Sequence, residues 1–73
     1  MRYAVVIEKL KHNYCAHVPD LPVCITTGKT YDETIVNMRE AIEGYIDSCR
    51  RHGQPVPLPK TRAVELDVEF DVA

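Results

Sequence analysis

The segment Val18-Pro19-Asp20-Leu21-Pro22-Val23-Cys24 (VPDLPVC) sets the path of the chain between two short apolar runs. Pro19 and Pro22 lack backbone N–H donors, and each favours an extended backbone in the residue before it. The segment therefore predicts a stiff corner between two strands, with Leu21 placed in the core or against the helix. A rigid corner also loses little entropy on binding. Asp20, Leu21 and Pro22 are for that reason candidate partner-binding residues as well.

The runs around this corner are typical of β-strands. Residues 2–9 and 14–18 are rich in β-branched and aromatic side chains, and the short polar break between them favours a hairpin. Residues 23–27 follow the corner as a third strand, which Gly28 ends. In the first run, alternate residues share one face of the strand and predict a buried side. These residues are Tyr3, Val5 and Ile7.

The middle of the chain predicts one long helix over residues 31–52. Thr30 and Glu33 form a capping box, in which the Thr30 hydroxyl accepts a hydrogen bond from the Glu33 N–H. Gly53 is suited to cap the far end. Apolar residues recur at spacings of three and four and define one buried stripe. They are Ile35, Met38, Ile42, Tyr45, Ile46 and Cys49.

The C-terminal part of the chain cannot continue this helix. Prolines alternate over residues 54–59 and predict a semi-rigid, extended connector. Residues 64–72 then alternate strictly between apolar and acidic side chains, which predicts a closing strand. The predicted fold class is α+β in the order β-β-β-α-β, a small antiparallel sheet with one long helix packed on one face. Residues 1–73 are expected to form a single domain.

The small size of the chain indicates that it needs support beyond its own core. A 73-residue domain is only marginally stable, and such domains gain stability from disulfides, metals or partner subunits. The three cysteines are odd in number and lack Cys-x-x-Cys spacing. The sequence opens on a strand-like run without a secretory signal or membrane span. We therefore expect a cytoplasmic protein with reduced thiols that forms a homodimer or homotetramer.

The distribution of charge points to a protein partner rather than to nucleic acid. The net charge is −2, and all nine Lys and Arg residues precede the acidic closing segment. A basic nucleic-acid-binding surface is therefore not supported. The acidic segment is a candidate surface for a basic partner, although its charges also suit the wet face or protected edge of a sheet. Its four acids are Glu65, Asp67, Glu69 and Asp71.

Two groups of side chains are conceivable chemical sites, but ordinary structural roles explain both. Glu8 and Glu40 are the only seeds for a two-metal nuclease site, and no further convergent acids accompany them. Cys15, His17 and Cys24 form a conceivable zinc cluster, but Cys-x-His is not a usual ligand pair. We therefore predict a protein that is not an enzyme, with no catalytic residues, cofactor or metal.

Three motifs together resemble the HicB family of antitoxins over roughly residues 1–60. They are Tyr14-x-Ala16-x-Val18-Pro19-Asp20-Leu21-Pro22-x-Cys24, Thr27-Gly28-x-Thr30 and, after Glu33, Asn37-x-x-Glu40-Ala41-Ile42. The resemblance implies a partially degraded ribonuclease H fold, self-association, and neutralisation of a small HicA-type toxin that cleaves mRNA. The alternative is an orphan homo-oligomeric structural or regulatory domain without a toxin.

The sequence departs from the family pattern at two places. Val23 stands where the family usually has glycine before the motif cysteine, which favours a more regular start to the third strand. Many relatives also continue into a C-terminal segment that binds operator DNA, whereas this sequence stops after the acidic run. Direct DNA binding and a separate DNA-binding domain are therefore not expected.

Overall fold

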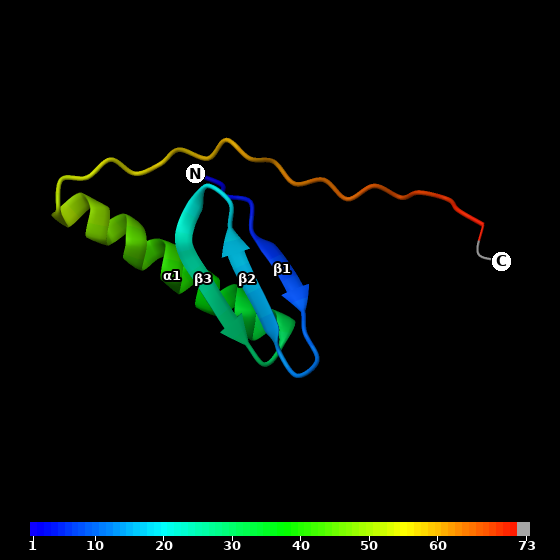
Figure 1. Ribbon diagram of the computed structural model, residues 1–73. Helices are drawn as coiled ribbons and strands as arrows, with labels where there is room; N and C mark the ends of the chain where they lie inside the picture. The colour runs from blue at the N-terminus through cyan, green and yellow to red at the C-terminus, as the bar shows by residue number, and fades with distance from the viewer. Residues whose placement is uncertain (72–73) are drawn as a thin grey trace.

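A computed structural model describes residues 1–71 and confirms the α+β fold class (Figure 1). Three strands precede one long helix in the chain. They are β1 (Val6–Lys9), β2 (Tyr14–Val18), β3 (Leu21–Gly28) and α1 (Tyr31–Arg51). The strands form one antiparallel sheet in the order β1-β2-β3, with α1 across one face. The predicted hairpin and the predicted helix are both present.

The central strand β2 sets the register of the sheet. On one side Val6 of β1 lies opposite His17, and a 2.7 Å hydrogen bond from Leu10 N to Asn13 O closes the connecting turn. On the other side β3 pairs with β2, and the register shifts between His17 and Val18. Such an irregularity bends the strand locally. The extra residues are 22–24 of β3, which belong to the proline corner, and they help to turn the chain.

The strand β3 begins at Leu21, two residues earlier than predicted. Pro22 is tolerated there because β3 is an edge strand, and an edge strand pairs with a neighbour on one side only. Among residues 1–71, only Gly53 has a positive φ angle, so Val23 has ordinary strand geometry. The pairing of β3 with β2 is nevertheless irregular here, because Ile25 lies opposite His17 whereas Leu21 lies opposite Val18. The more regular strand start predicted from Val23 is therefore wrong as far as the register is concerned.

Local sequence signals fix both ends of α1. Thr30 is the N-cap, and its hydroxyl oxygen accepts a 3.0 Å hydrogen bond from the Glu33 N–H, as the capping box predicted. At the other end Gly53 adopts a φ of 64°, and the Gln54 N–H donates to the Cys49 carbonyl at 2.8 Å. This pattern is a glycine-terminated helix end. The observed helix is one residue shorter than predicted.

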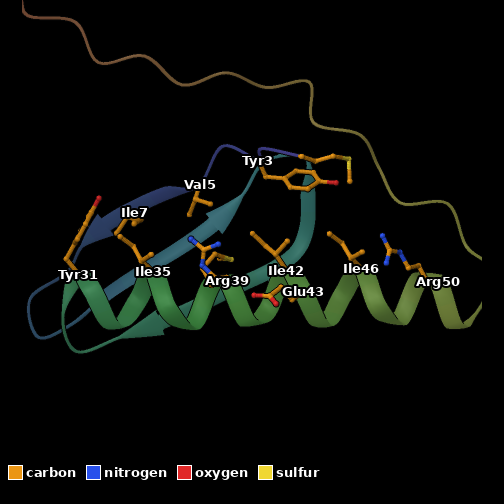
Figure 2. Close-up of a pocket in the computed structure, with 12 residues that line it drawn as sticks. Tyr3, Val5, Ile7, Tyr31, Ile35, Arg39, Ile42, Glu43, Ile46 and Arg50 are labelled. Carbon is orange, nitrogen blue, oxygen red and sulfur yellow. The ribbon is translucent and has the colours of Figure 1, made fainter.

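The apolar stripe of α1 faces the sheet, and one flank of the helix borders an open groove (Figure 2). All six stripe residues are buried or half-buried, as predicted. Met38 and Cys49 are the most buried of them, with 2% of each residue exposed. The helix packs chiefly against β3 and β2, and less against β1. The edge of the sheet at β1 is therefore only partly covered.

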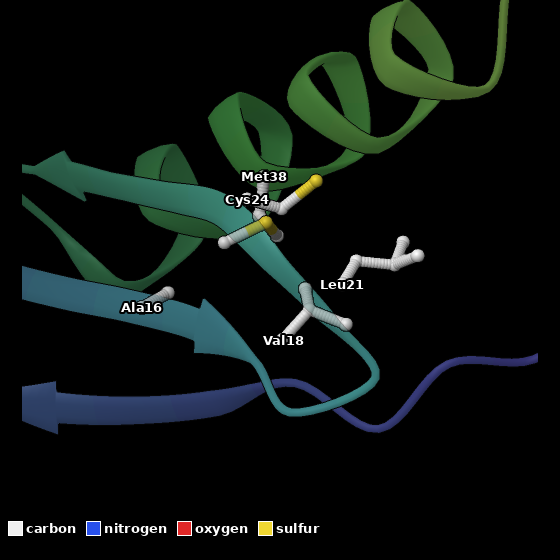
Figure 3. Close-up of a cluster of buried hydrophobic side chains, with 5 residues drawn as sticks. All are labelled: Ala16, Val18, Leu21, Cys24 and Met38. Carbon is white, nitrogen blue, oxygen red and sulfur yellow. The ribbon is translucent and has the colours of Figure 1, made fainter. Parts of the chain in front are cut away.

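The core gathers side chains from β2, the proline corner, β3 and α1 (Figure 3). Its buried members are Ala16, Val18, Leu21, Cys24 and Met38. Tyr3, Val5 and Ile7 pack against this core from the first strand run, as their alternation predicted. The core is small, which fits the marginal burial expected of a chain of this length.

The end of β3 passes very close to the first turn of α1. A Cβ atom added at Gly28 would lie 2.8 Å from the Thr34 backbone nitrogen, which is closer than real Cβ atoms approach. Thr34 is fully buried, and its hydroxyl donates a 2.7 Å hydrogen bond to the Thr30 carbonyl. The glycine is therefore needed because it lets strand and helix meet without a side chain between them.

The fifth predicted element is not formed as a strand within this chain. Residues 54–71 carry neither helix nor strand. They leave the end of α1, run back past the end of the sheet at which the N-terminus lies, and extend beyond the body (Figure 1). A strand requires a neighbouring strand, and residues 64–71 are exposed without one. Val72, the last apolar position of the predicted strand, lies outside the described residues.

Candidate partner-binding surfaces

The Asp20 carboxylate of the proline corner binds the C-terminal connector. Its Oδ2 atom accepts hydrogen bonds from the backbone N–H groups of Lys60 and Thr61, each at 2.9 Å. Its Oδ1 atom accepts a third, at 2.7 Å, from the Thr61 hydroxyl. Asp20 is 8% exposed. We call this arrangement the Asp20 clamp, and it joins residues forty positions apart in the sequence.

The clamp keeps Asp20 ionised. Hydrogen bonds from the Thr61 side chain, the Thr61 backbone and the Lys60 backbone, in that order, lower the pKa of Asp20 below its usual value of 3.8. Such bonds favour the charged carboxylate over the neutral acid. At neutral pH the carboxylate is therefore a charge-assisted acceptor for all three donors.

A second contact holds the connector further upstream. The Tyr3 hydroxyl donates a 2.6 Å hydrogen bond to the Pro57 carbonyl. Val56, Pro59 and Thr61 are half-buried, whereas residues 62–71 are exposed. The connector is therefore fixed to the body up to Thr61.

The three candidate residues of the corner have different surroundings. Leu21 is fully buried and Asp20 is engaged by the connector, so the structural role predicted for the corner is confirmed. Pro22 is exposed on the edge strand β3. Of the three, Pro22 is the one with substantial surface to offer a partner.

The four acidic candidates lie elsewhere, on the projecting end of the chain. Glu65, Asp67, Glu69 and Asp71 are all exposed. The apolar residues between them are also exposed, from 68% at Val68 to 78% at Phe70. We call residues 62–71 the tail. The structure places the tail acids and Pro22 on separate parts of the molecule, so they do not form one site.

An open groove at the sheet edge was not anticipated from the sequence. It has a volume of about 610 Å³ and lies between the N-terminal strand run and one flank of α1 (Figure 2). We call it the edge groove. Its apolar lining includes Tyr3, Val5, Ile7, Ile35, Ile42 and Ile46. The width of the apolar stripe on the helix could have indicated this groove, because a three-stranded sheet covers only part of so wide a stripe.

The sheet face opposite α1 is also uncovered. Val23 and Ile25 of β3 are 70% and 68% exposed there. His17 lies opposite Ile25 in the register, and Val6 lies opposite His17. This face, which we call the outer face, combines exposed apolar and polar side chains and is available for contact.

The conceivable Cys/His cluster is divided by the sheet. Cys24 is a core residue, whereas His17 is exposed on the outer face. Burial, and then the neighbouring Cys49 thiol, raise the pKa of Cys24, so that its thiol stays protonated at neutral pH. All three cysteines are free. The arrangement does not bring Cys15, His17 and Cys24 to a common point.

The two acids considered for a two-metal nuclease site are exposed on separate elements. Glu8 lies on β1 and Glu40 on α1. Within residues 1–71, no three or more His, Cys, Asp or Glu side chains are arranged to hold a metal ion. Over the same residues, no helix has the length and apolar character that crossing a membrane requires.

Comparison with known proteins identifies the family. Residues 3–70 match the HicB_like antitoxin of bacterial toxin–antitoxin systems, so the chain belongs to this family. The match includes the tail as well as the folded body. The resemblance inferred from the three sequence motifs is therefore confirmed, and it extends further along the chain than those motifs do.

Several relatives align over much of the chain. A UPF0150 protein of Thermoplasma acidophilum is 43% identical over 69 residues, which cover 93% of this chain and 97% of that protein. A UPF0150 protein of Synechocystis is 46% identical over 56 residues, covering 75% and 71%. An uncharacterized 14.9 kDa protein of Haemophilus phage HP1 is 35% identical, covering 89% of this chain but 47% of the phage protein. No solved structure matches this chain.

Proposed function

We propose that this chain is an antitoxin that neutralises a small, basic, HicA-type mRNA-cleaving toxin by covering its surface. Family membership supports the antitoxin role. The observation that carries the mode of binding is the row of four exposed carboxylates on the tail. Acidic groups opposite a basic protein accelerate association and fix its orientation. The chain acts by occlusion in the cytoplasm, without catalytic turnover and without direct DNA binding.

The acidic row is the first surface to test. A variant with Glu65→Gln, Asp67→Asn, Glu69→Gln and Asp71→Asn keeps the shape of the tail but removes its charge. The association rate with the toxin should fall by roughly tenfold or more at low salt, and its dependence on ionic strength should flatten. Glu40→Gln, on the exposed side of α1, is the matched control and should change neither quantity.

The partner itself must first be isolated from the native host. Purification of the chain at its natural level, followed by mass spectrometry, should recover a small basic protein encoded by a neighbouring reading frame. Stopped-flow binding then compares the charge-neutral tail with the parent chain. An unchanged association rate would remove the tail acids from the interface, while absence of any small basic partner would remove the antitoxin assignment.

The second candidate function is an orphan homo-oligomeric structural or regulatory domain. It is favoured by the unfilled edge groove and by the exposed apolar side of the tail. Both candidates include self-association, and we propose that the chain forms a homodimer or homotetramer. The neighbouring reading frame separates them, because the orphan has no toxin gene beside it.

A further inference from the structure

The sheet has an unfinished edge at β1. In the order β1-β2-β3, β1 pairs with β2 and has its other edge free. The helix packs mainly over β3 and β2, so the flank of α1 overhangs this edge without covering it. Figure 2 shows Val5 and Ile7 on the strand side of the edge groove and Ile35 and Ile42 on the helix side. This geometry suits a further strand with one apolar face.

The tail has the pattern of the strand that this edge lacks. Apolar and acidic side chains alternate from Val64 to Asp71, so an extended backbone places them on opposite sides. The four apolar side chains are between 68% and 78% exposed, although they are large. Within the described residues, the tail carries no strand pairing. An exposed strand-like segment and an open sheet edge are complementary surfaces.

We propose that two copies of this chain exchange their tails. Residues 64–70 of each copy add as a strand to the free edge of β1 in the other copy. The apolar side of the tail then fills the edge groove, and the exchange is reciprocal, as expected for a two-fold symmetric dimer. The side chains that enter the groove are Val64, Leu66, Val68 and Phe70.

The course of the chain favours binding of the tail in the groove of a second copy over binding in the groove of its own copy. The Asp20 clamp fixes Thr61 to the body, and the tail continues outward from that point (Figure 1). To reach its own β1 edge, the tail would have to leave its straight course and bend toward the sheet directly after the clamp (Figure 1). Residues 60–66, which follow directly from the clamp, contain no Gly, Pro, Asn, Asp or Ser, the residues that dominate tight turns. A straight tail that projects from the body reaches a neighbouring copy more readily.

The dimensions of the two surfaces agree. An extended segment from residue 64 to residue 70 spans about 20 Å. The groove-lining residues of α1 run from Tyr31 to Arg50, which corresponds to about 29 Å of helix. The tail therefore fits within the length of the groove.

The exchanged strand leaves the tail carboxylates outside the groove. Because side chains alternate, they point toward the outer face of the sheet, beside the outward residues of β1, Val6 and Glu8. Tail exchange and toxin binding through the acids are therefore compatible. The inference rests on the proposed self-association but not on the toxin, so it is tested on the isolated chain.

The first experiment changes the apolar side of the tail in the full-length chain. The parent chain should elute, by size-exclusion chromatography with light scattering, at twice its mass of 8.3 kDa. The double variant Leu66→Asp, Phe70→Asp should raise the dimer dissociation constant on the order of 100-fold or more, since buried anchors dominate interfaces. The matched control Glu69→Gln lies on the acidic side and should stay dimeric. Circular dichroism should show the helix content of the parent chain in each variant, as the check that its body remains folded.

The second experiment locates the tail. A dimer mixed from isotope-labelled and unlabelled chains should give intermolecular nuclear Overhauser effects between the Phe70 ring and the methyl groups of Ile42 or Ile46. A parent chain that is monomeric overturns both the exchange and the proposed self-association. A dimer that survives the double variant, or whose tail contacts lie within one copy or on the outer face, overturns the exchange alone.

Discussion

The connector and the tail are consecutive parts of one extended segment, yet they relate to the body in opposite ways. Residues 54–61 are anchored by Tyr3 and Asp20 through four hydrogen bonds. Residues 62–71 are exposed along their whole length. The connector has three prolines, whereas the tail has the clean strand pattern. Within a single copy, a segment is therefore fixed where the body offers it hydrogen-bond partners. The strength of its strand-like sequence pattern does not decide this.

The largest expected effect is a loss of stability of the folded body, caused by a substitution in its core. Leu21→Ala removes a fully buried side chain beside the corner and should lower the free energy of unfolding by about 2–5 kcal/mol. Leu58→Ala, in the connector, removes the same atoms from a residue that is 72% exposed and should cost less than about 0.5 kcal/mol. Urea unfolding measures both changes. Equal losses would contradict the placement of Leu21 in the core.

A smaller effect is expected from opening the Asp20 clamp. Asp20→Asn removes the charge that strengthens three hydrogen bonds, and the Lys60 and Thr61 amides should exchange hydrogen about tenfold faster or more. Their exchange should then approach that of the tail. Thr61→Val deletes only the hydroxyl donor and should have a weaker effect. Unaltered exchange at both amides in Asp20→Asn would show that the connector is held by other contacts.

Acid should open the same clamp without a mutation. The folded-state pKa of Asp20 is lowered, so its contribution to stability is complete above the unfolded value of 3.8 and is lost as pH falls through the lower folded value. The amide chemical shifts of Lys60 and Thr61 should therefore move together below pH 3.8 and stay constant above it. In Asp20→Asn this transition should be missing, and its persistence would assign it to another group.

The smallest expected effect stabilises the body and leaves the segment alone. A Cβ atom added at Gly44, on the exposed side of α1, meets nothing within 4 Å. Gly44→Ala should therefore add about 1 kcal/mol to the free energy of unfolding by restricting the unfolded chain and favouring helix. Calorimetry should show a higher Tm with unchanged amide exchange in the connector. A lower Tm would indicate that another copy packs against Gly44.

Elements fixed by neighbours in sequence were predicted closely. The helix was expected at residues 31–52 and found at Tyr31–Arg51, because the Thr30 cap and the Gly53 end are both local signals. The buried sides of the first strand run and of α1 followed from simple alternation and helical spacing. For these elements, the residues that determine the boundaries and the buried side lie within a few positions of each other in the sequence.

Features that depend on distant groups were predicted less well. Asp20 reads as one residue of a corner, and nothing nearby shows that it binds the backbone forty residues later. The tail has the alternation of a strand, but that pattern does not say which edge completes it or to which copy the edge belongs. The edge groove is likewise a property of the packed sheet and helix rather than of either sequence alone.

The clamp also affects how freely the connector can change its composition. Two of the three donors to Asp20 are main-chain N–H groups, which every residue except proline supplies. Lys60 can therefore be replaced by almost any amino acid without losing its hydrogen bond to Asp20. The only side-chain donor in the clamp is the Thr61 hydroxyl. The carboxylate thus recognises the route of the polypeptide rather than its side chains, and introducing proline at position 60 or 61 is the substitution that this junction cannot accommodate.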